Sequence, residues 1–393
     1  LESVTLPENL TSIKSYAFLR CKSIESLVIP DKLTSTDIGD GVFAGCSNLR
    51  SVILPKGLTA IKKEMFSGCS RLTDIVLPES VTEIEARAFS NCSDLTELAL
   101  PKGLTMIGDS AFSYSGLLSV NLPEGLKSIG ASAFASVKFT TVTLPNSLTD
   151  LGEAALSGDS NLESITIPNN ITELKKTFSN CWGLKTVSLP AGLQKIEGAF
   201  SGCSQLEMIT IPDNVTVIGD DTFRYCYKLK KIHLPKNLTQ IGYEAFYGCE
   251  ELTNISLPEK LENIDTGAFK NCPNLLGIYI PSANVQIKSR AIGYNSDTEK
   301  NEKLVLISQS GSSTEKYAQN TGIHFHNITD SLMHQNSVSA TCVKDGNVEY
   351  WHCDTCGQNF SNAEGTVVLD VTAVAKLKHK NVYVPYKEAT CTT

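Results

Sequence analysis

The sequence predicts a repeat solenoid of the α/β type, a right-handed superhelix of short coils with a parallel β-sheet along its concave side. Two observations lead to this fold class. Prolines recur every 22 or 23 residues, apart from one gap of 25, and phenylalanines recur with the same period. Self-similarity at such a period is the signature of a solenoid. The prolines that mark the period are Pro7, Pro30, Pro55, Pro78, Pro101, Pro123, Pro145, Pro168, Pro190, Pro212, Pro235, Pro258 and Pro281.

A single unit shows why the repeat folds into stacked coils. Val52 and Leu54 alternate toward one side, as a short strand requires, and Pro55 ends the strand because it has no N–H to donate. Leu58 and Ile61 then precede a turn or short helix. One coil cannot bury its own apolar side, whereas a coil stacked between neighbours can. We therefore expect about thirteen coils, whose strands form one long parallel sheet with a spacing of about 4.8 Å.

Two columns of equivalent residues run through the repeats. The first is aromatic: Phe18, Phe43, Phe66, Phe89, Phe112, Phe134, Phe178, Phe200, Phe223, Phe246 and Phe269, with Leu156 and Ile292 at the two remaining positions. The second follows three residues later: Cys21, Cys46, Cys69, Cys92, Cys181, Cys203, Cys226, Cys249 and Cys272, with Ser115, Val137 and Asp159 as replacements. The cysteines are either a disulfide or metal array or small buried thiols. Their replacement by Ser, Val and Asp favours buried thiols, a common environment for free cysteine.

The repeated unit resembles the BspA-like leucine-rich repeats of bacterial surface proteins. The features that carry the resemblance are the strand-ending Ile/Leu-Pro, the Ala-Phe pair and the cysteine three residues after Phe. We divide the chain into leucine-rich repeats at 1–301, a C-terminal cap of the solenoid at 302–327, in which Ser312 or Ser313 caps a short helix, and a small mostly-β module at 328–393. The resemblance implies an exported protein that binds host or neighbouring-cell components, with no catalytic residues to carry over.

Composition and motifs exclude several classes of function. The net charge of −8 argues against nucleic acid as a partner, since phosphate binding needs clustered Lys and Arg. The apolar runs are too short to span a bilayer, and the motifs of phosphate loops, serine hydrolases and zinc proteases do not occur. We therefore expect a monomeric, non-enzymatic protein. Leu1 already lies inside a repeat, so we interpret the chain as a fragment of an extracellular or cell-surface protein whose signal peptide and anchor lie outside it.

The outward positions of the predicted strands indicate where a partner would bind. Most carry small, polar or β-branched residues, which suit a pleated surface in any case. Val28, Ile53 and Val76 form one aligned apolar run, which we take as a candidate partner-binding site. The main hypothesis is adhesion or scaffolding through a protein partner, including host extracellular proteins. The alternative is a carbohydrate- or peptidoglycan-binding module of a larger wall-associated protein or enzyme, although no aromatic platform for sugars is present.

After Asn327 the period stops and a second kind of repeat begins. Leu332-Met-His334 with Cys342 recurs as Leu377-Lys-His379 with Cys391. One full copy of a short module is therefore followed by the start of another. The pattern resembles a tandem-type cysteine module of gut bacterial surface proteins.

The cysteines of this module suggest a structural zinc site. Cys353-x-x-Cys356 followed by Gly357 resembles a zinc knuckle, and Cys342 with His379 or His334 would complete a Cys₃His site. The alternatives are a disulfide between Cys342 and one of the pair, or plain buried thiols. His324, His326 and His334 also cluster near the junction, a pattern typical either of a metal site or of a strand or linker surface. For the repeats we expect no cofactor.

Overall fold

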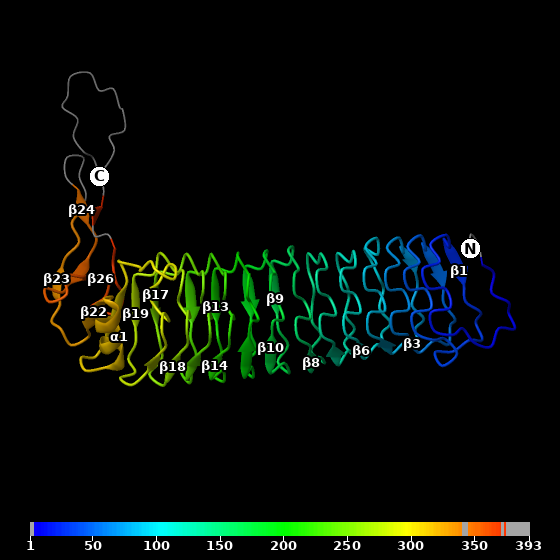
Figure 1. Cartoon of the computed structure of the whole chain (residues 1–393), viewed down its shortest axis with the longest axis horizontal. Helices are drawn as coiled ribbons and strands as arrows, with labels where there is room; N and C mark the ends of the chain where they lie inside the picture. The colour runs from blue at the N-terminus through cyan, green and yellow to red at the C-terminus, as the bar shows by residue number, and fades with distance from the viewer. Residues whose placement is uncertain (1–3, 340–344, 371–372, 375–393) are drawn as a thin grey trace, which may run out of the picture.

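The computed structural model describes residues 4–339, 345–370 and 373–374. Figure 1 shows short coils stacked along one long axis, with the N-terminal coils at one end and the C-terminal strands at the other. Successive coils pair through parallel strands, for example Ser26↔Ser51 and Thr186↔Ser164. The predicted solenoid is therefore confirmed.

A first row of strands runs along one side of the stack, and all but its last two members lie shortly before a period-marking proline. In a typical member such as β9 (Ser164–Thr166), the middle residue points into the core and the flanking residues are exposed. The row comprises β1 (Ser26–Val28), β2 (Ser51–Ile53), β4 (Asp74–Ile75), β9, β11 (Thr186–Ser188), β13 (Met208–Thr210), β15 (Lys231–His233), β17 (Asn254–Ser256), β19 (Gly277–Tyr279), β21 (Val305–Ser308) and β22 (His324–Asn327).

This first row is not the continuous sheet that the sequence predicts. Between β4 and β9 only the isolated bridge Asn121↔Thr143 remains. Phe112–Pro123 and Phe134–Pro145 are one residue shorter than the corresponding Phe89–Pro101. Since side chains and hydrogen-bonding groups alternate along a strand, a connection that is one residue short disturbs the pairing with both neighbours.

A second row of strands, which the sequence pattern does not predict, lies at the second apolar pair of each unit, directly before the predicted turn. Its inward residues are the second members of these pairs, such as Ile84 and Ile107 of two successive coils, which lie opposite each other across a parallel strand pair. The row comprises β3 (Ala60–Ile61), β5 (Glu83–Ile84), β6 (Met106–Ile107), β7 (Ser128–Ile129), β8 (Asp150–Leu151), β10 (Glu173–Lys175), β12 (Lys195–Glu197), β14 (Val217–Ile218), β16 (Gln240–Ile241), β18 (Asn263–Ile264) and β20 (Gln286–Ile287). Each coil therefore has two strand positions.

The phenylalanine column forms the centre of the core. Neighbouring rings stack face to face, and the Phe89 and Phe112 centroids are 5.3 Å apart with an interplanar angle of 3°. The turn that carries each ring needs two left-handed residues, which flank it at fixed distances. Around Phe89 these are Arg87 (φ 56°) and Asn91 (φ 59°). Non-glycine residues rarely adopt this conformation, so the packing of the ring holds the turn in place.

The cysteine column lies beside the phenylalanines and consists of unpaired thiols, as predicted. All of its members are buried except Cys21, which is half-buried. Each buried thiol donates to the carbonyl of the phenylalanine-column residue in the preceding coil, which is Leu156 for Cys181; the Cys92 Sγ lies 3.2 Å from the Phe66 oxygen. Burial raises the pKa of Cys46 to about 11 and that of Cys181 to about 12. These thiols are therefore structural and unreactive in the folded protein.

Thiol titration checks this arrangement. In the native protein the buried members of the cysteine column should not react with an aromatic disulfide reagent, because they are protonated and out of contact with solvent. After denaturation without reductant, at least the nine thiols of the column should react. A count near zero in the denatured protein would show that they are paired.

The C-terminal end of the stack is closed by a short helix and two strands. Helix α1 (Ser313–Thr321) has Ser312 as its N-cap, whose hydroxyl accepts from the Glu315 N–H at 3.2 Å, and Gly322 ends it in the left-handed region. Of the two predicted N-cap residues of this helix, Ser312 is confirmed. Ala318 is buried in the core of the solenoid, and strand β21 is buried along its whole length.

Beyond the solenoid the strands become antiparallel. Strand β25 (Tyr350–His352) pairs with β23 (Met333–Gln335) and with β26 (Asn359–Phe360), while β24 (Gly346–Asn347) pairs with β27 (Ala373–Val374). These strands belong to the small module.

The module packs against the last strands of the first row. Phe360 and Val368 contact the outward side chains Val305 and Ile307 of β21. The Asn254 amide donates to the Val368 carbonyl at 3.3 Å and accepts from the Val368 N–H at 3.1 Å. The module and the solenoid therefore share one apolar cluster.

Candidate functional site

The outward residues of the first strand row form the surface that we call the strand face. In β1 and β13 the two end residues are exposed while the middle residue is buried. Because neighbouring strands pair in parallel and in register, equivalent residues form straight rows along the stack. At the C-terminal end the module covers this face, so that the outward residue Gly277 is buried.

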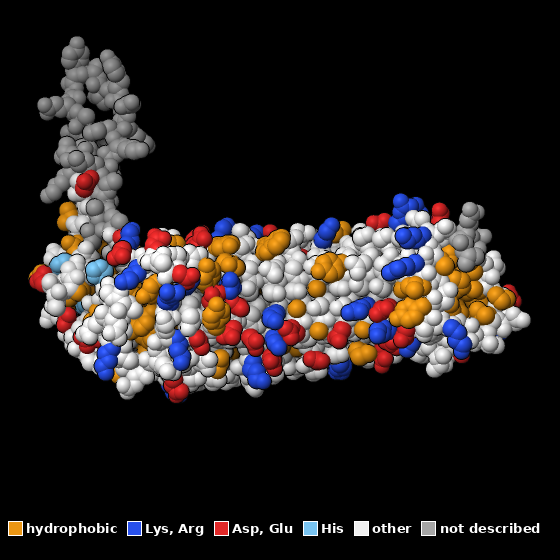
Figure 2. Space-filling model, viewed as in Figure 1, with side chains coloured by type: hydrophobic (Ala, Val, Ile, Leu, Met, Phe, Trp, Pro, Cys, Tyr) orange, Lys and Arg blue, Asp and Glu red, His pale blue; other side chains and the backbone are white. Residues whose placement is uncertain are grey.

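The predicted apolar residues lie in one such row, which we call the apolar row. Val28, Ile53 and Val76 are 58%, 61% and 76% exposed. Val28 lies opposite Ile53 across β1 and β2, and Val76 directly follows β4. Figure 2 shows hydrophobic side chains gathered over and around β1, with Lys and Arg beside them. A contiguous exposed apolar surface is unusual in a protein without a partner.

A hollow adjoins the apolar row. It has a volume of about 840 Å³ and is lined by Val4 and Leu6 as well as by Val28 and Ile53. Apolar side chains of a partner would therefore be able to pack along the apolar row and to insert into the hollow beside it.

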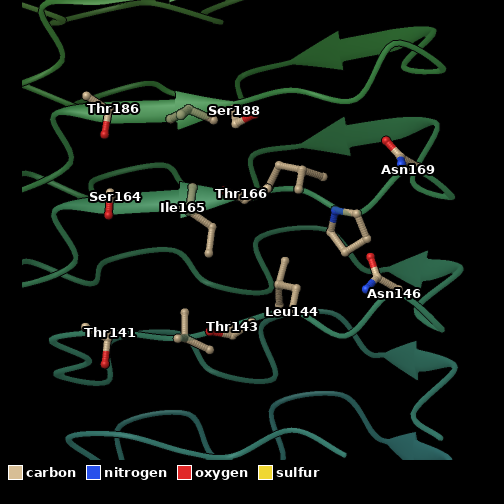
Figure 3. Close-up of a pocket in the computed structure, with 14 residues that line it drawn as sticks. Thr141, Thr143, Leu144, Asn146, Ser164, Ile165, Thr166, Asn169, Thr186 and Ser188 are labelled. Carbon is tan, nitrogen blue, oxygen red and sulfur yellow. The ribbon is translucent and has the colours of Figure 1, made fainter. Parts of the chain in front are cut away.

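A second hollow lies on the strand face over β9 and β11 and has a different chemistry. Its volume is about 630 Å³, and its outward lining consists of hydroxyl and amide side chains. Figure 3 shows that the hydroxyl groups of Thr141, Ser164 and Thr186 extend in the same direction from consecutive coils. Such a row offers hydrogen bonds but no aromatic ring for a sugar to stack on.

The described residues contain one group of three potential metal ligands, which we call the junction cluster: His326, Cys353 and Cys356. His326 lies on β22 of the solenoid cap, and the two cysteines lie between β25 and β26 of the module. Gly357 in the left-handed region (φ 71°) closes the turn, and its N–H donates to the Cys353 carbonyl at 2.8 Å. This tight turn directs both sulfurs toward the cap.

The junction cluster is compact and lies largely out of contact with solvent. Its ligand atoms all lie within 4.8 Å of one another, and the His326 Nδ1 is 3.3 Å from the Cys356 Sγ. His326 and Cys353 are buried, and the Phe360 ring packs on the imidazole at a centroid distance of 4.5 Å. Burial lowers the pKa of His326 and raises that of Cys356 to about 12. Without a bound ion the imidazole and this thiol are therefore both neutral.

The residues predicted to bind zinc are only partly described. Cys353 and Cys356 lie together, whereas Cys342 and His379 lie outside the described residues. His334 does not belong to the junction cluster; its Nε2 contacts the Glu349 carboxylate at 2.7 Å, and its ring stacks on Trp351.

The sequence indicates that histidines gather at the junction but not which of them meets the cysteines. His324 and His326 are two residues apart on β22 and therefore lie on the same face of the strand, yet His324 is exposed while His326 is buried. Only the docking of the module on the cap shows which of the two positions the cysteines meet.

The fold defines the chain as a leucine-rich-repeat solenoid. It belongs to the family described as the BspA type leucine rich repeat region, whose model matches in six copies over residues 1–117, 82–197 and 175–299. A search of the curated proteins gives no match. Leucine-rich-repeat proteins generally bind other proteins, and solenoids of this fold are typically not enzymes.

Two solved structures illustrate the structural similarity. A leucine-rich repeat protein from Bacteroides ovatus is 28% identical, with a TM-score of 0.64, and the match covers 81% of this chain and 88% of that one. A leucine rich cell surface protein from Faecalibacterium prausnitzii is 25% identical, with a TM-score of 0.49, and the match covers 78% and 85%. In the part of the chain that the structure describes, no helix has the length and apolar character needed to cross a bilayer.

Proposed function

We propose that this chain is a non-catalytic binding protein of the bacterial cell surface or extracellular space. It acts in adhesion or scaffolding and holds a protein of the host or of a neighbouring cell on its strand face. The apolar row is the observation that carries this proposal. Three branched apolar side chains that are each more than half exposed leave apolar surface in water that a partner would cover.

The apolar row suits a protein partner in size and chemistry. Burying the exposed part of one such side chain contributes at most about 1.5–3 kcal/mol before the cost of association, and the adjoining hollow can accept an anchoring side chain. The row lies at the opposite end of the solenoid from the module, so a partner there does not compete with the module for the strand face. Membership of the BspA-type family supports a surface location.

A second function has its own observation. The hydroxyl-lined hollow over β9 and β11 would suit a carbohydrate or a peptidoglycan strand, because hydroxyl and amide side chains can both donate to and accept from sugar hydroxyls. The missing aromatic ring makes this the second choice.

Paired lysine substitutions separate the two functions. Ile53→Lys with Val76→Lys should raise the Kd for a protein partner at least about tenfold, which corresponds to about 1.4 kcal/mol, because each change places a charge where an apolar contact forms. Both side chains are exposed, so the fold should tolerate them. The measurement is binding to panels of host extracellular proteins and of glycans.

The matched control is Thr143→Lys with Thr166→Lys, two outward positions that line the hydroxyl hollow. This variant should bind the protein partner as the wild type does. A glycan hit that the control loses and the Ile53/Val76 variant keeps would favour the carbohydrate function. A protein hit that both variants keep would show that the apolar row is ordinary sheet surface.

A further inference from the structure

The geometry points to a zinc site in the junction cluster, where His326 of the solenoid cap and Cys353 and Cys356 of the module bind one ion together. The inference goes beyond the proposed function, because it concerns how the module is attached and not what the strand face binds. It also differs from the site expected from the sequence, since its histidine belongs to the solenoid.

The distances fit an ion of this kind. In tetrahedral zinc sites with Zn–S of about 2.3 Å and Zn–N of about 2.0 Å, ligand nitrogen and sulfur atoms lie about 3.5 Å apart. The His326 Nδ1 and the Cys356 Sγ are 3.3 Å apart, and the whole cluster fits within 4.8 Å. An ion could therefore enter with small side-chain rotations. The fourth position of the tetrahedron is left to a water molecule or one further side chain.

The state of the imidazole supports a ligand role. His326 is fully buried; among the described residues its imidazole makes one hydrogen-bond contact, with the Cys356 sulfur, and its Nε2 has no partner. Buried polar groups are normally paired, because an unpaired one costs about 1–3 kcal/mol. A metal ion would give this histidine a strong partner in place of a weak contact with a thiol.

The donor set selects the metal. Two sulfurs and one imidazole are soft and borderline ligands, which favour zinc over calcium or magnesium. When zinc binds, the two thiol protons pass to the solvent and the sulfurs bind as thiolates. No change of oxidation state is involved.

The position of the cluster gives the ion a structural role. His326 lies on β22, which pairs with β21 of the solenoid, whereas the cysteines lie 27 and 30 residues later in the module. Among the described residues the apolar cluster between the two parts is small: Val305, Ile307, Phe360 and Val368 are buried in it, and side chains such as Leu276, Tyr279 and Trp351 are only partly buried against it. Zinc would therefore fix the module on the end of the strand face, where burial alone contributes little.

The first experiment is elemental analysis of the full chain, both as purified and after chelation followed by zinc addition and dialysis. We expect about one zinc per chain by the stoichiometry of a single site. With cobalt in place of zinc, the protein should show thiolate-to-metal charge-transfer absorption and the visible bands of a tetrahedral site. Chelation should speed amide hydrogen exchange in residues 345–370 and leave the central coils unchanged.

Two histidine variants test the choice of ligand. His326→Gln should abolish the metal content, while His334→Gln should keep it, because His334 pairs with Glu349 and does not belong to the junction cluster. Cys356→Ser should lose the ion, and Cys21→Ser in the first coil should retain it.

Because His326 is buried, its loss could also disturb packing, and His326→Cys controls for that. A sulfur ligand at this position should restore stoichiometric zinc, which a purely structural role would not predict. The inference is overturned if the zinc-treated wild type holds no stoichiometric ion, if His326→Gln still binds it, or if His326→Cys fails together with His326→Gln.

Discussion

Replacing Phe112 with alanine should lower the free energy of unfolding by about 3–5 kcal/mol. The ring is fully buried and stacks on Phe89 and Phe134, with both centroid distances 5.3 Å and both interplanar angles 3°. The backbone cannot close around the gap, because the Phe112 N–H donates to the Ala133 carbonyl of the next coil at 2.8 Å. The cavity therefore persists, and the free energy of unfolding falls by the full cost of the cavity.

The effect of Phe112→Ala should also be local. Each coil contacts only its neighbours, so hydrogen exchange should accelerate in the coils around residue 112 and much less near Phe246. The matched control is Tyr114→Ala, an aromatic-to-alanine change in the same turn at a side chain that is 61% exposed. It should change stability by no more than about 0.5 kcal/mol. Equal losses for both variants would show that the column is not the centre of the core.

Lowering the pH from 7 to 4 should stabilise the wild type relative to an Asp159→Asn variant by about 2 kcal/mol. Asp159 is buried at a cysteine position of the column, and burial raises the pKa of its carboxyl from 3.8 to about 6. Its Oδ2 accepts from the Phe139 N–H at 3.0 Å, and its Oδ1 accepts from the Asn161 N–H at 3.1 Å. These two bonds oppose the shift, but desolvation of the charge is the larger effect.

The direction of this pH effect follows from proton binding. Between pH 6 and 4 the folded state takes up a proton at Asp159 that the unfolded state does not, so acid favours folding in this window. Above pH 6 the carboxylate is charged in both states and its burial is unfavourable. Asparagine has the same shape and stays neutral throughout. Carboxyls with lowered pKa values, such as Asp213 and Asp297, titrate in both proteins and cancel.

Melting curves of the two proteins from pH 4 to pH 7.5 measure this difference. The gap in melting temperature should widen in favour of the wild type as the pH falls through 6 and should widen more slowly near 4, where the unfolded carboxyl also begins to take up a proton. A gap that stays constant with pH would mean that Asp159 has an ordinary pKa and is hydrated in the folded protein.

The sequence alone predicts those features of the fold that depend on periodicity. The proline spacing defines the coils, and the Phe and Cys columns define the core, because one pattern repeated many times can be compared with itself. The second strand row was missed, since two-residue strands such as β5 contain too few residues to show an alternation. Short apolar segments of this kind are compatible with a turn, a helix or a strand.

Features that depend on a single position could not be predicted in the same way. Asp159 appears in the sequence as an irregular member of the cysteine column. Its role as a hydrogen-bond acceptor depends on the short connection before Phe139, because its carboxylate accepts a hydrogen bond from the Phe139 N–H. Leu184 occupies the position that corresponds to Phe139 in a regular coil. Its N–H donates instead to the Cys181 carbonyl of its own coil. Likewise, the partnership of His326 with Cys356 depends on how the module docks, which no local pattern encodes.

The stacking of coils along one axis determines how the molecule would respond to a pulling force. The first coils and helix α1 lie at opposite ends of the long axis (Figure 1), so tension applied there loads the contacts between coils in series. Each contact then carries the full force, and the weakest opens first. A released coil of about 22 residues adds about 70 Å of extended chain in place of a spacing of about 4.8 Å. Such a solenoid would lengthen stepwise under load while its remaining coils stay folded.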